Sequence, residues 1–400
     1  MTISLAVALA LTGCLGGESG TTSPPPTYGT FDAGPTPGTD TGVVDTDASN
    51  LPPTADAQVF PPFDPPSELT IATYNVENLF DLVDDPDHEE GEFTPSPGRW
   101  DASRVASRLS RLAQVFKEID ADIVEVNEVE NLAILTQLRD TIRQAGGPNY
   151  LYLAVANGRD IRGIKVSVMS RYPIVKSFGR PINLEHTCLS VQNRQPITLN
   201  GSTPEPRPIF QVEINVDADQ AADLILLGNH WKAKIGESFN CDSDEHRLRS
   251  GLQLRAVYEQ LMNEDPQRNI VALGDFNSFE FERPLKEGVQ AELNLDAQAD
   301  IFDAWGDAGV IAAHTTNNNR WNNVTNSTYY YSGDWGRLDH LLLGAPLVSG
   351  ANGWSLVPNS VEPVHPAFAL KSGHPAAWNG NDGSGYSDHL PVRLKLRLVN

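Results

Sequence analysis

Cysteine is scarce in this sequence, which has three cysteines in 400 residues. After Cys14 only Cys188 and Cys241 remain, so the later part of the chain can form at most one disulfide bond. An exported compartment would allow the two to pair, and the sequence alone leaves that open. The apolar run at residues 1–14 is too short to cross a bilayer, so it does not predict a membrane-spanning helix.

Positive charge is scarce as well. The chain has 29 Lys and Arg against 52 Asp and Glu, a net charge of −23. Residues 1–68 hold eight of the acids and no Lys or Arg, so the rest of the chain carries −15. Proteins that hold nucleic acid by general attraction usually present a basic face, which this composition does not supply. A phosphate substrate would therefore be held locally, most simply through bound cations.

The first 67 residues predict export and a tether. Residues 1–14 end in Leu-Thr-Gly-Cys14, which resembles the lipobox of bacterial lipoprotein signal peptides, although the usual Lys or Arg near the start is missing. Residues 15–67, rich in Gly, Ser, Thr, Pro and Asp, predict a disordered tether. We expect an exported, monomeric lipoprotein, anchored to a membrane on its extracytoplasmic side or at the cell surface, whose folded domain spans residues 68–400.

The segment 269–278 is the clearest structural signal. Its apolar residues 270–273 predict a strand buried on both faces, and such strands belong to sheets covered by helices. Past Gly274, Asp275 and Asn277 lie two residues apart and point the same way if the chain stays extended. Polar residues at the carboxyl end of a strand stand where open α/β sheets bind their ligands.

The rest of the domain alternates predicted strands and helices, which describes one α/β domain. An amphipathic helix is predicted over 101–119, with Arg104, Arg108 and Arg111 away from its apolar face. Residues 315–331, rich in Asn and Tyr, are predicted to form a long loop. The remaining predicted helices are 132–144 and 245–262, and the predicted strands are 68–80, 120–131, 151–156, 163–170, 208–216, 222–228, 269–273, 336–343 and a last one beginning at 386.

Polar residues end strand after strand. The set is Asn75, Glu128, His230, Asp275, Asn277, Asp339, Asp388 and His389. Carboxylates such as Glu128 and Asp388 suit Mg²⁺, Mn²⁺ or Ca²⁺, and too few Cys and His surround them for a zinc site. Two histidines with spare carboxylates supply a general acid and a general base. Together these groups suit phosphoester hydrolysis.

Six short blocks resemble the endonuclease/exonuclease/phosphatase superfamily, which includes DNase I, exonuclease III-like repair enzymes, neutral sphingomyelinases and inositol-phosphate phosphatases. They follow the family's order over residues 68–400. The blocks are Thr73-Tyr74-Asn75-Val76, Val126-Asn127-Glu128-Val129, Asn229-His230, Gly274-Asp275-Phe276-Asn277, Arg337-Leu338-Asp339-His340 and Ser387-Asp388-His389-Leu390-Pro391. The resemblance implies a metal-dependent phosphoesterase with a four-layer α/β/β/α sandwich, two mixed β-sheets flanked by helices.

The resemblance also implies a metal site. Glu128 looks like the main ligand, with Asn75 and Asp388 close to it and Mg²⁺ as the expected ion, Mn²⁺ and Ca²⁺ being alternatives. One departure is that Asn127 precedes Glu128 where the family usually has Gln. The shorter amide leaves the hydrogen bonds around the ligand open to change.

For catalysis, the resemblance implies that His389 is the general base, or the group that orients the attacking water, with Asp339 as its carboxylate partner. Asp275 and Asn277 look like residues that position the nucleophile and hydrogen-bond the scissile phosphate. His230 is similar to the second histidine of the DNase I-like members, which donates to a phosphate oxygen or to the leaving oxygen.

A second departure concerns His230. Lys165 stands where the family's Arg-Gly-Ile strand has an acidic residue, so the carboxylate partner of His230 stays unassigned, with Asp160 as a candidate. Alternatively, Arg162 or Lys165 meets a substrate phosphate. We interpret His340 as a strand residue facing the second layer rather than as a catalytic group.

Three functions remain open from the sequence. DNA or RNA is the first choice of substrate, because Asn229-His230-Trp231-Lys232 looks like the histidine block of bacterial secreted nucleases. The acidity of the domain keeps a sphingomyelinase-like, phospholipase C-like or phosphomonoesterase activity as an alternative. A catalytically inactive surface-binding lipoprotein is disfavoured, because an inactive copy has no physical reason to keep buried charges in one cleft.

Overall fold

The computed structural model describes residues 65–399 except 159, 183–186, 190–195, 199–206, 218, 220, 235–242 and 307–323, with the backbone alone at 187–189 and 196–198. The predicted signal segment, nearly all of the predicted tether and Cys241 lie outside the described residues, as does the side chain of Cys188. The chain divides into the units Met1–Gln58 and Val59–Asn400, and every described residue belongs to the second.

Two mixed β-sheets form the centre of this unit. Each contains one parallel pair of strands, β1 with β2 and β9 with β10, among antiparallel neighbours. In order across the first sheet, the strands are β15 (Trp354–Leu356), β19 (Val392–Leu398), β1 (Glu68–Leu79), β2 (Ile123–Val129), β4 (Lys165–Ser170) and β3 (Tyr152–Val155), with β16 (Glu362–Pro363) also paired to β19. Across the second they are β11 (Ile301–Asp303), β14 (Asp339–Gly344), β10 (Ile270–Asp275), β9 (Leu224–His230), β8 (Ile209–Ile214) and β5 (Ile174–Arg180).

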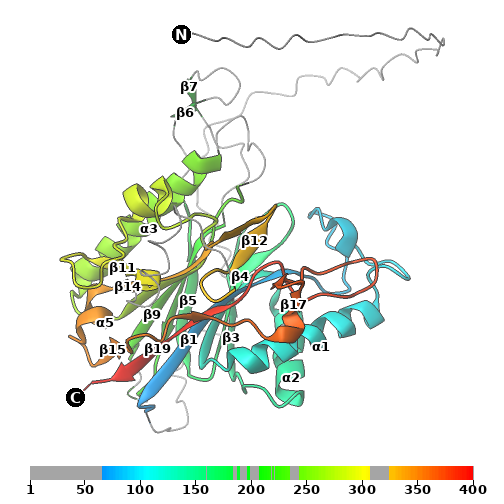
Figure 1. Cartoon of the computed structure of the whole chain (residues 1–400), viewed down its shortest axis with the longest axis horizontal. Coiled ribbons are helices and arrows are strands. Elements are labelled where there is room, and N and C mark those ends of the chain that lie inside the picture. The colour runs from blue at the N-terminus through cyan, green and yellow to red at the C-terminus, as the bar shows by residue number, and fades with distance from the viewer. Residues whose placement is uncertain are drawn as a thin grey trace, which may run out of the picture. The chain divides into compact units, whose positions relative to one another are not determined.

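Helices flank the two sheets on opposite sides, α1 (Ala102–Ile119) and α2 (Leu132–Gln144) on one and α3 (Ser243–Glu264) on the other (Figure 1). Three hydrophobic clusters separate these four layers. Alternation along β9 shows the arrangement, because Leu226 lies in the cluster between the sheets and Leu227 lies in the cluster against α3. The predicted four-layer α/β/β/α sandwich is confirmed.

Smaller elements connect the layers. A π-helical turn, Pro284–Val289, packs on α3, where a Cβ at Gly251 would lie 2.3 Å from the carbonyl oxygen of Pro284. Glycine at 251 therefore permits this close approach. The other elements are the 3₁₀ turns Gly91–Phe93, Ala304–Gly306 and Ala367–Ala369, the helix α5 (Ala345–Ser349), and the hairpins β6 (Thr187–Leu189)/β7 (Pro196–Thr198), β12 (Tyr329–Tyr331)/β13 (Asp334–Gly336) and β17 (Leu370–Lys371)/β18 (His374–Pro375).

Local capping explains why the predicted helix boundaries were accurate. The Asp101 side chain accepts from the backbone N–H of Arg104 at the start of α1, and Asn131 does the same for Ile134 at the start of α2. These caps satisfy backbone donors that a helix leaves free in its first turn.

Three expectations need correction, and one strand of the second sheet was missed. Tyr329–Tyr331 is strand β12 of a hairpin, not loop. The last strand begins at Val392, because residues 386–391 run irregularly past the sheet end. Strand β5 is half-buried along most of its length, without an alternation of buried and exposed residues, and it was not predicted. Arg108 is fully buried, whereas the helical wheel placed it away from the apolar face.

Adjacent bulges distort β1 and β2 at their carboxyl ends. The pairing register shifts between Asn75 and Leu79. Glu77, Asn78 and Glu128 have φ angles of 52°, 63° and 67°, in the left-handed region that non-glycine residues rarely adopt. Bulges re-aim side chains, and strained backbone of this kind clusters at functional sites. The distortion therefore lies where a functional site is expected, at the carboxyl end of β1 and β2.

Candidate active site

One pocket collects seven of the eight sequence-predicted residues, and the eighth, Asp339, contacts it from below through His389. The cavity has a volume of about 870 Å³. Its predicted lining residues come from the ends of β1, β2, β9 and β10 and from the turn before β19, namely Asn75, Glu128, His230, Asp275, Asn277, Asp388 and His389. Segments more than 300 residues apart in sequence are thus brought together, as in the 2.7 Å bond from the Ser387 hydroxyl to the carbonyl of Asn75.

His389 and Asp339 form a buried pair. Nδ1 of His389 lies 2.8 Å from Oδ2 of Asp339, and Nε2 on the other side of the ring lies 3.8 Å from Oδ2 of Asp275. With Nδ1 donating its proton to Asp339, Nε2 faces the pocket. Burial lowers the pKa of His389, but the carboxylates of Asp339, Asp275 and Asp388 outweigh it and hold the pKa well above its usual range.

Asp275 and Asn277 are held by a tight turn after β10. Oδ1 of Asp275 accepts from the backbone N–H of Asn277 at 2.9 Å, and Oδ2 accepts from the Asn277 amide at 3.0 Å. Gly274 precedes them with φ of 134°, and a Cβ there would lie 1.9 Å from the carbonyl oxygen of Asn229. Only glycine fits. Burial, opposed by His389 and reinforced by Asp339, raises the pKa of Asp275 to about 7.

The sheet register explains how Asp275 sits between the other groups. It is paired with His230 on parallel β9 and with Asp339 on antiparallel β14. Adjacent strands lie about 5 Å apart, so three functional side chains end up side by side across three strands. The amide of Asn75 bridges from the first sheet, donating to Oδ2 of Asp275 at 3.1 Å and to Oε1 of Glu128 at 3.3 Å.

Carboxylates crowd the part of the pocket around Glu128. Its Oε2 accepts from the backbone N–H of Asn78 at 3.0 Å. Burial and the nearby charge of Asp388 raise the pKa of Glu77 to about 8, and burial raises the pKa of Asp388 as well, with Glu128 adding to it. Like charges this close destabilise one another unless a cation or a proton compensates.

This donor set fits a hard divalent cation. The oxygens of Glu128 and Asp388 face a pocket to which Glu77 adds a third carboxylate, and oxygen ligands with excess negative charge are what Mg²⁺, Mn²⁺ and Ca²⁺ prefer. Asp275, Asp339 and His389 also offer ligand atoms within 4.8 Å of one another. The hydrogen bond from Nδ1 of His389 to Oδ2 of Asp339 already occupies one possible metal-ligand atom of each residue, which favours the Glu128 side for a metal.

His230 has no carboxylate partner at its Nδ1 atom among the described residues. Asp160, the candidate partner, instead binds Arg207, with 2.8 Å between Oδ2 and Nη2, so that prediction is wrong. Burial lowers the pKa of His230 well below its usual range, and Arg207 and Arg162 lower it further. His230 is therefore a neutral imidazole. Its Nε2 lies 3.5 Å from Oε1 of Glu128, on the pocket side.

Of the two cations that the sequence offers for contact with a substrate phosphate, one lines the pocket and the other does not. Arg162 lines the pocket, with its side chain 40% exposed and its Nη2 atom 3.9 Å from Oε1 of Glu128. Lys165 does not line it and donates to the carbonyl oxygens of Glu130 and Gly163. Of the two, Arg162 is the one in reach of a substrate.

Three supporting residues were missed by sequence reasoning. Glu77 accepts from the backbone N–H groups of Asp388 and Trp378, at 3.0 and 2.7 Å, and so ties β1 to the segment carrying His389. Arg207 lines the pocket and pairs with Asp160, but the residues around it in the sequence form no motif that indicates this position. Arg108 donates to the carbonyls of Val76, Glu77 and Tyr386 from α1 beneath the site. An arginine at helical spacing carries no signal of such burial.

His340 lies in β14, as expected for a strand residue, and supports the site from outside the pocket. Its Nδ1 is 2.8 Å from Oδ2 of Asp303 and its Nε2 is 2.9 Å from the carbonyl oxygen of Ser278. Burial lowers the pKa of His340, but Asp303 and Glu280 outweigh it and raise the pKa to about 8. A buried imidazolium thus holds the turn that carries Asn277.

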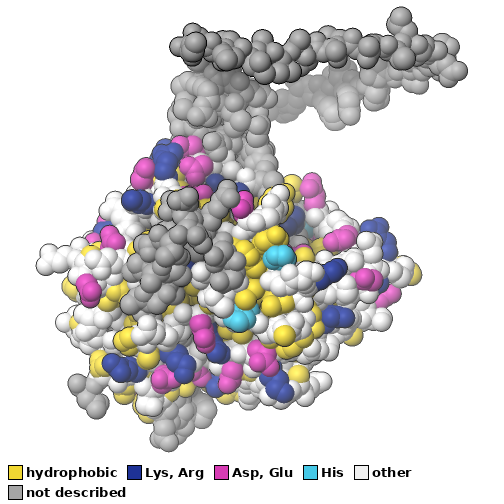
Figure 2. Space-filling view, in the orientation of Figure 1, with side chains coloured by type: hydrophobic (Ala, Val, Ile, Leu, Met, Phe, Trp, Pro, Cys, Tyr) yellow, Lys and Arg dark blue, Asp and Glu magenta, His cyan; other side chains and the backbone are white. Residues whose placement is uncertain are grey.

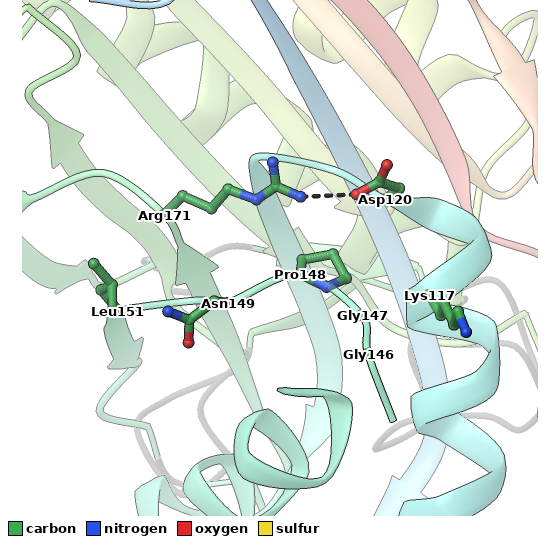
Figure 3. A pocket seen from close by; sticks show the side chains of 8 residues that line it. All are labelled: Lys117, Asp120, Gly146, Gly147, Pro148, Asn149, Leu151 and Arg171. Carbon is green, nitrogen blue, oxygen red and sulfur yellow. Dashed lines mark hydrogen bonds and ion pairs between the residues drawn. The ribbon is translucent and has the colours of Figure 1, made fainter. Parts of the chain in front are cut away.

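A second surface pocket lies at the opposite end of the first sheet (Figure 3). It is lined by residues at the end of α1, after α2 and after β4, including Lys117, Asp120 and Arg171. Arg171 binds Asp120 at 2.7 Å and Asp122 at 3.0 Å, so its charge is already matched. The described residues that line this pocket include neither a histidine nor a group of unmatched carboxylates, so nothing in them supports a catalytic role.

Comparison with known proteins agrees with the motifs. A sequence profile described as the Endonuclease/Exonuclease/phosphatase family matches residues 70–398. The chain belongs to this family. It is therefore a metal-dependent hydrolase acting on phosphoester bonds, and the predicted superfamily and enzyme class are confirmed. A search among curated proteins gave no match.

Similar solved structures share little sequence with the chain. A Bacteroides thetaiotaomicron endonuclease/exonuclease/phosphatase family protein is 15% identical, with a TM-score of 0.47 over 83% of this chain and 95% of that one. A Bacteroides vulgatus endonuclease/exonuclease/phosphatase is 16% identical, with a TM-score of 0.46 over 84% and 100%. D. rerio TDP2, complexed with single strand DNA product, is 15% identical, with a TM-score of 0.46 over 83% and 100%.

Proposed function

We propose that this protein is an extracytoplasmic nuclease that hydrolyses phosphodiester bonds with Mg²⁺. The observation that carries the proposal is the single pocket in which the His389–Asp339 pair, Asp275 and Asn277 face the carboxylates of Glu128 and Asp388. A base, a positioning pair and an oxygen-rich cation site in one pocket are the parts that phosphodiester hydrolysis needs.

The chain's own residues divide the work. Glu128 and Asp388 would hold the divalent ion, which neutralises charge that builds up on the phosphate oxygens. Nε2 of His389 faces the attacking water, because Asp339 engages the other ring nitrogen, and it would accept the proton of that water once a bound cation offsets the carboxylates that raise its pKa. The Asn277 amide and neutral His230 donate hydrogen bonds to the phosphate, and a neutral donor suits a site already shared by Arg162 and Arg207.

Two features support nucleic acid as the substrate. Arg162, Arg207 and Lys234 line the pocket, so a chain with a net charge of −23 still places cations there, although Arg207 also pairs with Asp160 and Lys234 with Glu282. The block Asn229-His230-Trp231-Lys232 also looks like that of bacterial secreted nucleases. Local cations with a bound metal can hold a phosphodiester although the protein as a whole repels polyanions.

The test is hydrolysis of plasmid DNA, RNA, sphingomyelin and a phosphomonoester by the purified full-length chain. Each substrate is incubated with Mg²⁺, Mn²⁺, Ca²⁺ or chelator. His389→Ala tests the base and Glu128→Gln tests the metal site, and Phe368→Ala, an exposed aromatic outside the pocket, is the matched control.

We expect nucleic acid to be cut with Mg²⁺ and not with chelator, and both site variants to be inactive beside an active control. Glu128→Gln should also abolish the rise in thermal stability that Mg²⁺ gives to the wild-type chain, since only binding to the folded state raises stability. Turnover of sphingomyelin or the phosphomonoester alone would contradict the proposal that nucleic acid is the substrate, and it would leave the roles assigned to His389 and Glu128 unchanged.

The proposed location rests on the N-terminal segment ending at Cys14. In a bacterial host, Cys14→Ser should move the protein from the membrane fraction and end its labelling with radioactive palmitate. If wild-type protein takes up no palmitate, the lipoprotein anchor is wrong. No helix among the described residues is both long and apolar enough to cross a membrane.

A further inference from the structure

Aromatic side chains form one wall of the active-site pocket. Tyr329, Tyr331 and Trp335, from the hairpin of β12 and β13, line it. Figure 2 shows hydrophobic side chains gathered near the middle of the face of the molecule that it draws, at the place where Figure 1 labels β12. None of these aromatic residues has a part in the metal and proton chemistry described above.

The hairpin is fastened directly to the catalytic segment. Tyr329 and His389 form an antiparallel β-bridge, and the backbone N–H of Leu390 donates to the carbonyl oxygen of Thr328 at 2.6 Å. The ring centroids of Tyr329 and His389 are 4.7 Å apart. A group bound against the Tyr329 ring therefore lies beside the reacting atoms.

The second tyrosine extends this surface outward. Tyr331 lies two residues along the same strand, so its side chain points to the same face as that of Tyr329. The two rings are nearly parallel, at 12°, with centroids 6.4 Å apart. Tyr331 is 61% exposed, although burying an aromatic ring normally stabilises a protein. An exposed ring aligned with a pocket ring is placed to take a planar ligand.

The intervening residue, Tyr330, supports the hairpin through aromatic contacts with His374 and Trp335. Tyr330 stacks on His374 of β18, with centroids 3.6 Å apart and an angle of 17°, and it meets Trp335 edge-on at 5.1 Å. These contacts hold in place the strand that carries Tyr329 and Tyr331. A preformed aromatic surface loses little conformational freedom when it binds.

Phe279 and Phe281, from the loop after β10, also line the pocket, and the Phe279 ring lies against β13, where a Cβ at Gly336 would be 2.7 Å from it. The ammonium of Lys234 lies 3.6 Å from the Phe279 ring centroid and pairs with Glu282 at 2.5 Å. A cation next to aromatic rings matches a ligand that carries phosphates between planar groups.

We propose that Tyr329 and Tyr331 form a stacking platform for a nucleobase of the nucleotide next to the scissile phosphate. This proposal rests on the proposed nuclease function and names how its substrate is held. Because every base has a π-face, the platform accepts all four bases and gives the enzyme little sequence preference.

The composition of the wall favours a base over an acyl chain. Among the described residues that line the pocket, five are aromatic and only Ala233 and Leu338 are aliphatic. Acyl chains pack equally well on aliphatic side chains, so a lipid site has no need of parallel rings. Ser332 and Asp334 at the hairpin turn also keep the rim polar.

The experiment compares Tyr331→Phe, Tyr331→Leu and Phe368→Leu in the full-length chain with Mg²⁺. Phe retains the ring, Leu retains apolar surface without it, and Phe368 is a control of 41% exposure outside the pocket. The substrates are a single-stranded thymidine oligonucleotide and the same strand with abasic residues. Tyr331 is exposed, so none of these changes removes core packing.

We expect Tyr331→Leu to lower kcat/KM on the intact strand by about five- to tenfold, the lower part of the range for one stacked base. Tyr331→Phe and Phe368→Leu should keep the wild-type value. On the abasic strand the Leu variant should lose much less, because that strand has no base to stack.

Binding is measured separately with 2-aminopurine in the oligonucleotide and His389→Ala as the common background. Stacking should quench the fluorescence with Tyr or Phe at position 331 and not with Leu. Cleavage by wild type with equal values for Tyr331→Leu and Phe368→Leu would overturn the platform and leave the nuclease standing. An equal loss on intact and abasic strands would also overturn it, whereas no cleavage of nucleic acid by wild type would overturn the proposed function itself.

Discussion

The two ends of the first sheet treat charge in opposite ways. At the end shown in Figure 3, Arg171 binds Asp120 and Asp122, and the Asp120 side chain is 67% exposed. At the other end, Glu128 is buried beside Asp388, with more carboxylates than cations around it. Matched exposed charges contribute little to stability, whereas crowded buried charges lower it.

The backbone differs in degree, because Asp120, with a φ of 42°, is the one non-glycine residue in the left-handed region among the described residues that line the pocket of Figure 3. Glu77, Asn78, Glu128 and Asn277 all adopt left-handed φ angles around the active-site pocket. Each such residue costs about 1 to 3 kcal/mol relative to ordinary backbone and persists only where its surroundings hold it. The active end is therefore less stable by itself and relies on buried supports such as Arg108 and His340. Function, rather than stability, explains its composition.

The largest effect should come from changing the pair formed by His389 and Asp339. Asp339→Asn keeps the shape of the side chain but removes the charge that orients His389, so kcat should fall about 10²- to 10⁴-fold. Single-turnover cleavage of a DNA strand at saturating enzyme measures this. The same rate as wild type would remove His389 and Asp339 from the chemical step.

Removing a buried support should act on stability. Arg108→Met leaves three backbone carbonyls and Glu77 without their cation, and the free energy of unfolding should fall by about 3 kcal/mol or more. Urea unfolding measures it, with Arg104→Met on the same helix as the control. If the two variants are equally stable, Arg108 does not hold the site together.

The buried His340 should make stability depend on pH. Its pKa is about 8 in the folded protein, against 6.5 for an ordinary histidine, so folding is favoured by the protonated ring. That contribution, about 2 kcal/mol, is fully present below pH 6.5 and is lost as pH rises through 8. Urea unfolding of wild type between these values should show the decline, and His340→Gln should flatten it. An identical slope in both proteins would assign the decline to other groups.

The smallest effect is expected at the opposite end. Arg171→Ala removes two exposed ion pairs and should lower the free energy of unfolding by no more than about 1 kcal/mol, with cleavage unchanged. Paired urea and cleavage assays check both. A large loss of activity would show that the two ends are coupled and would undo the contrast between them.

Prediction from sequence succeeded where the signal was local. The buried run before Asp275, the Asp101 cap and the strand-end motifs each depend on neighbouring residues. It failed where long-range contacts decide. Arg108 has the same helical spacing as the less buried Arg104 and Arg111, Asp160 binds Arg207 rather than His230, and β12 becomes a strand through its pairing with β13.

The sequence by itself determined the family, the α/β alternation and the set of polar residues at strand ends, because these follow from hydrophobic period and from short motifs. Only the tertiary structure decided which charges meet. It placed Asp275 between His230 and Asp339, left Nδ1 of His230 without a carboxylate among the described residues, and set Tyr329 beside His389. Those distances depend on sheet register and on bulges, which pair residues far apart in the chain and leave no pattern along it.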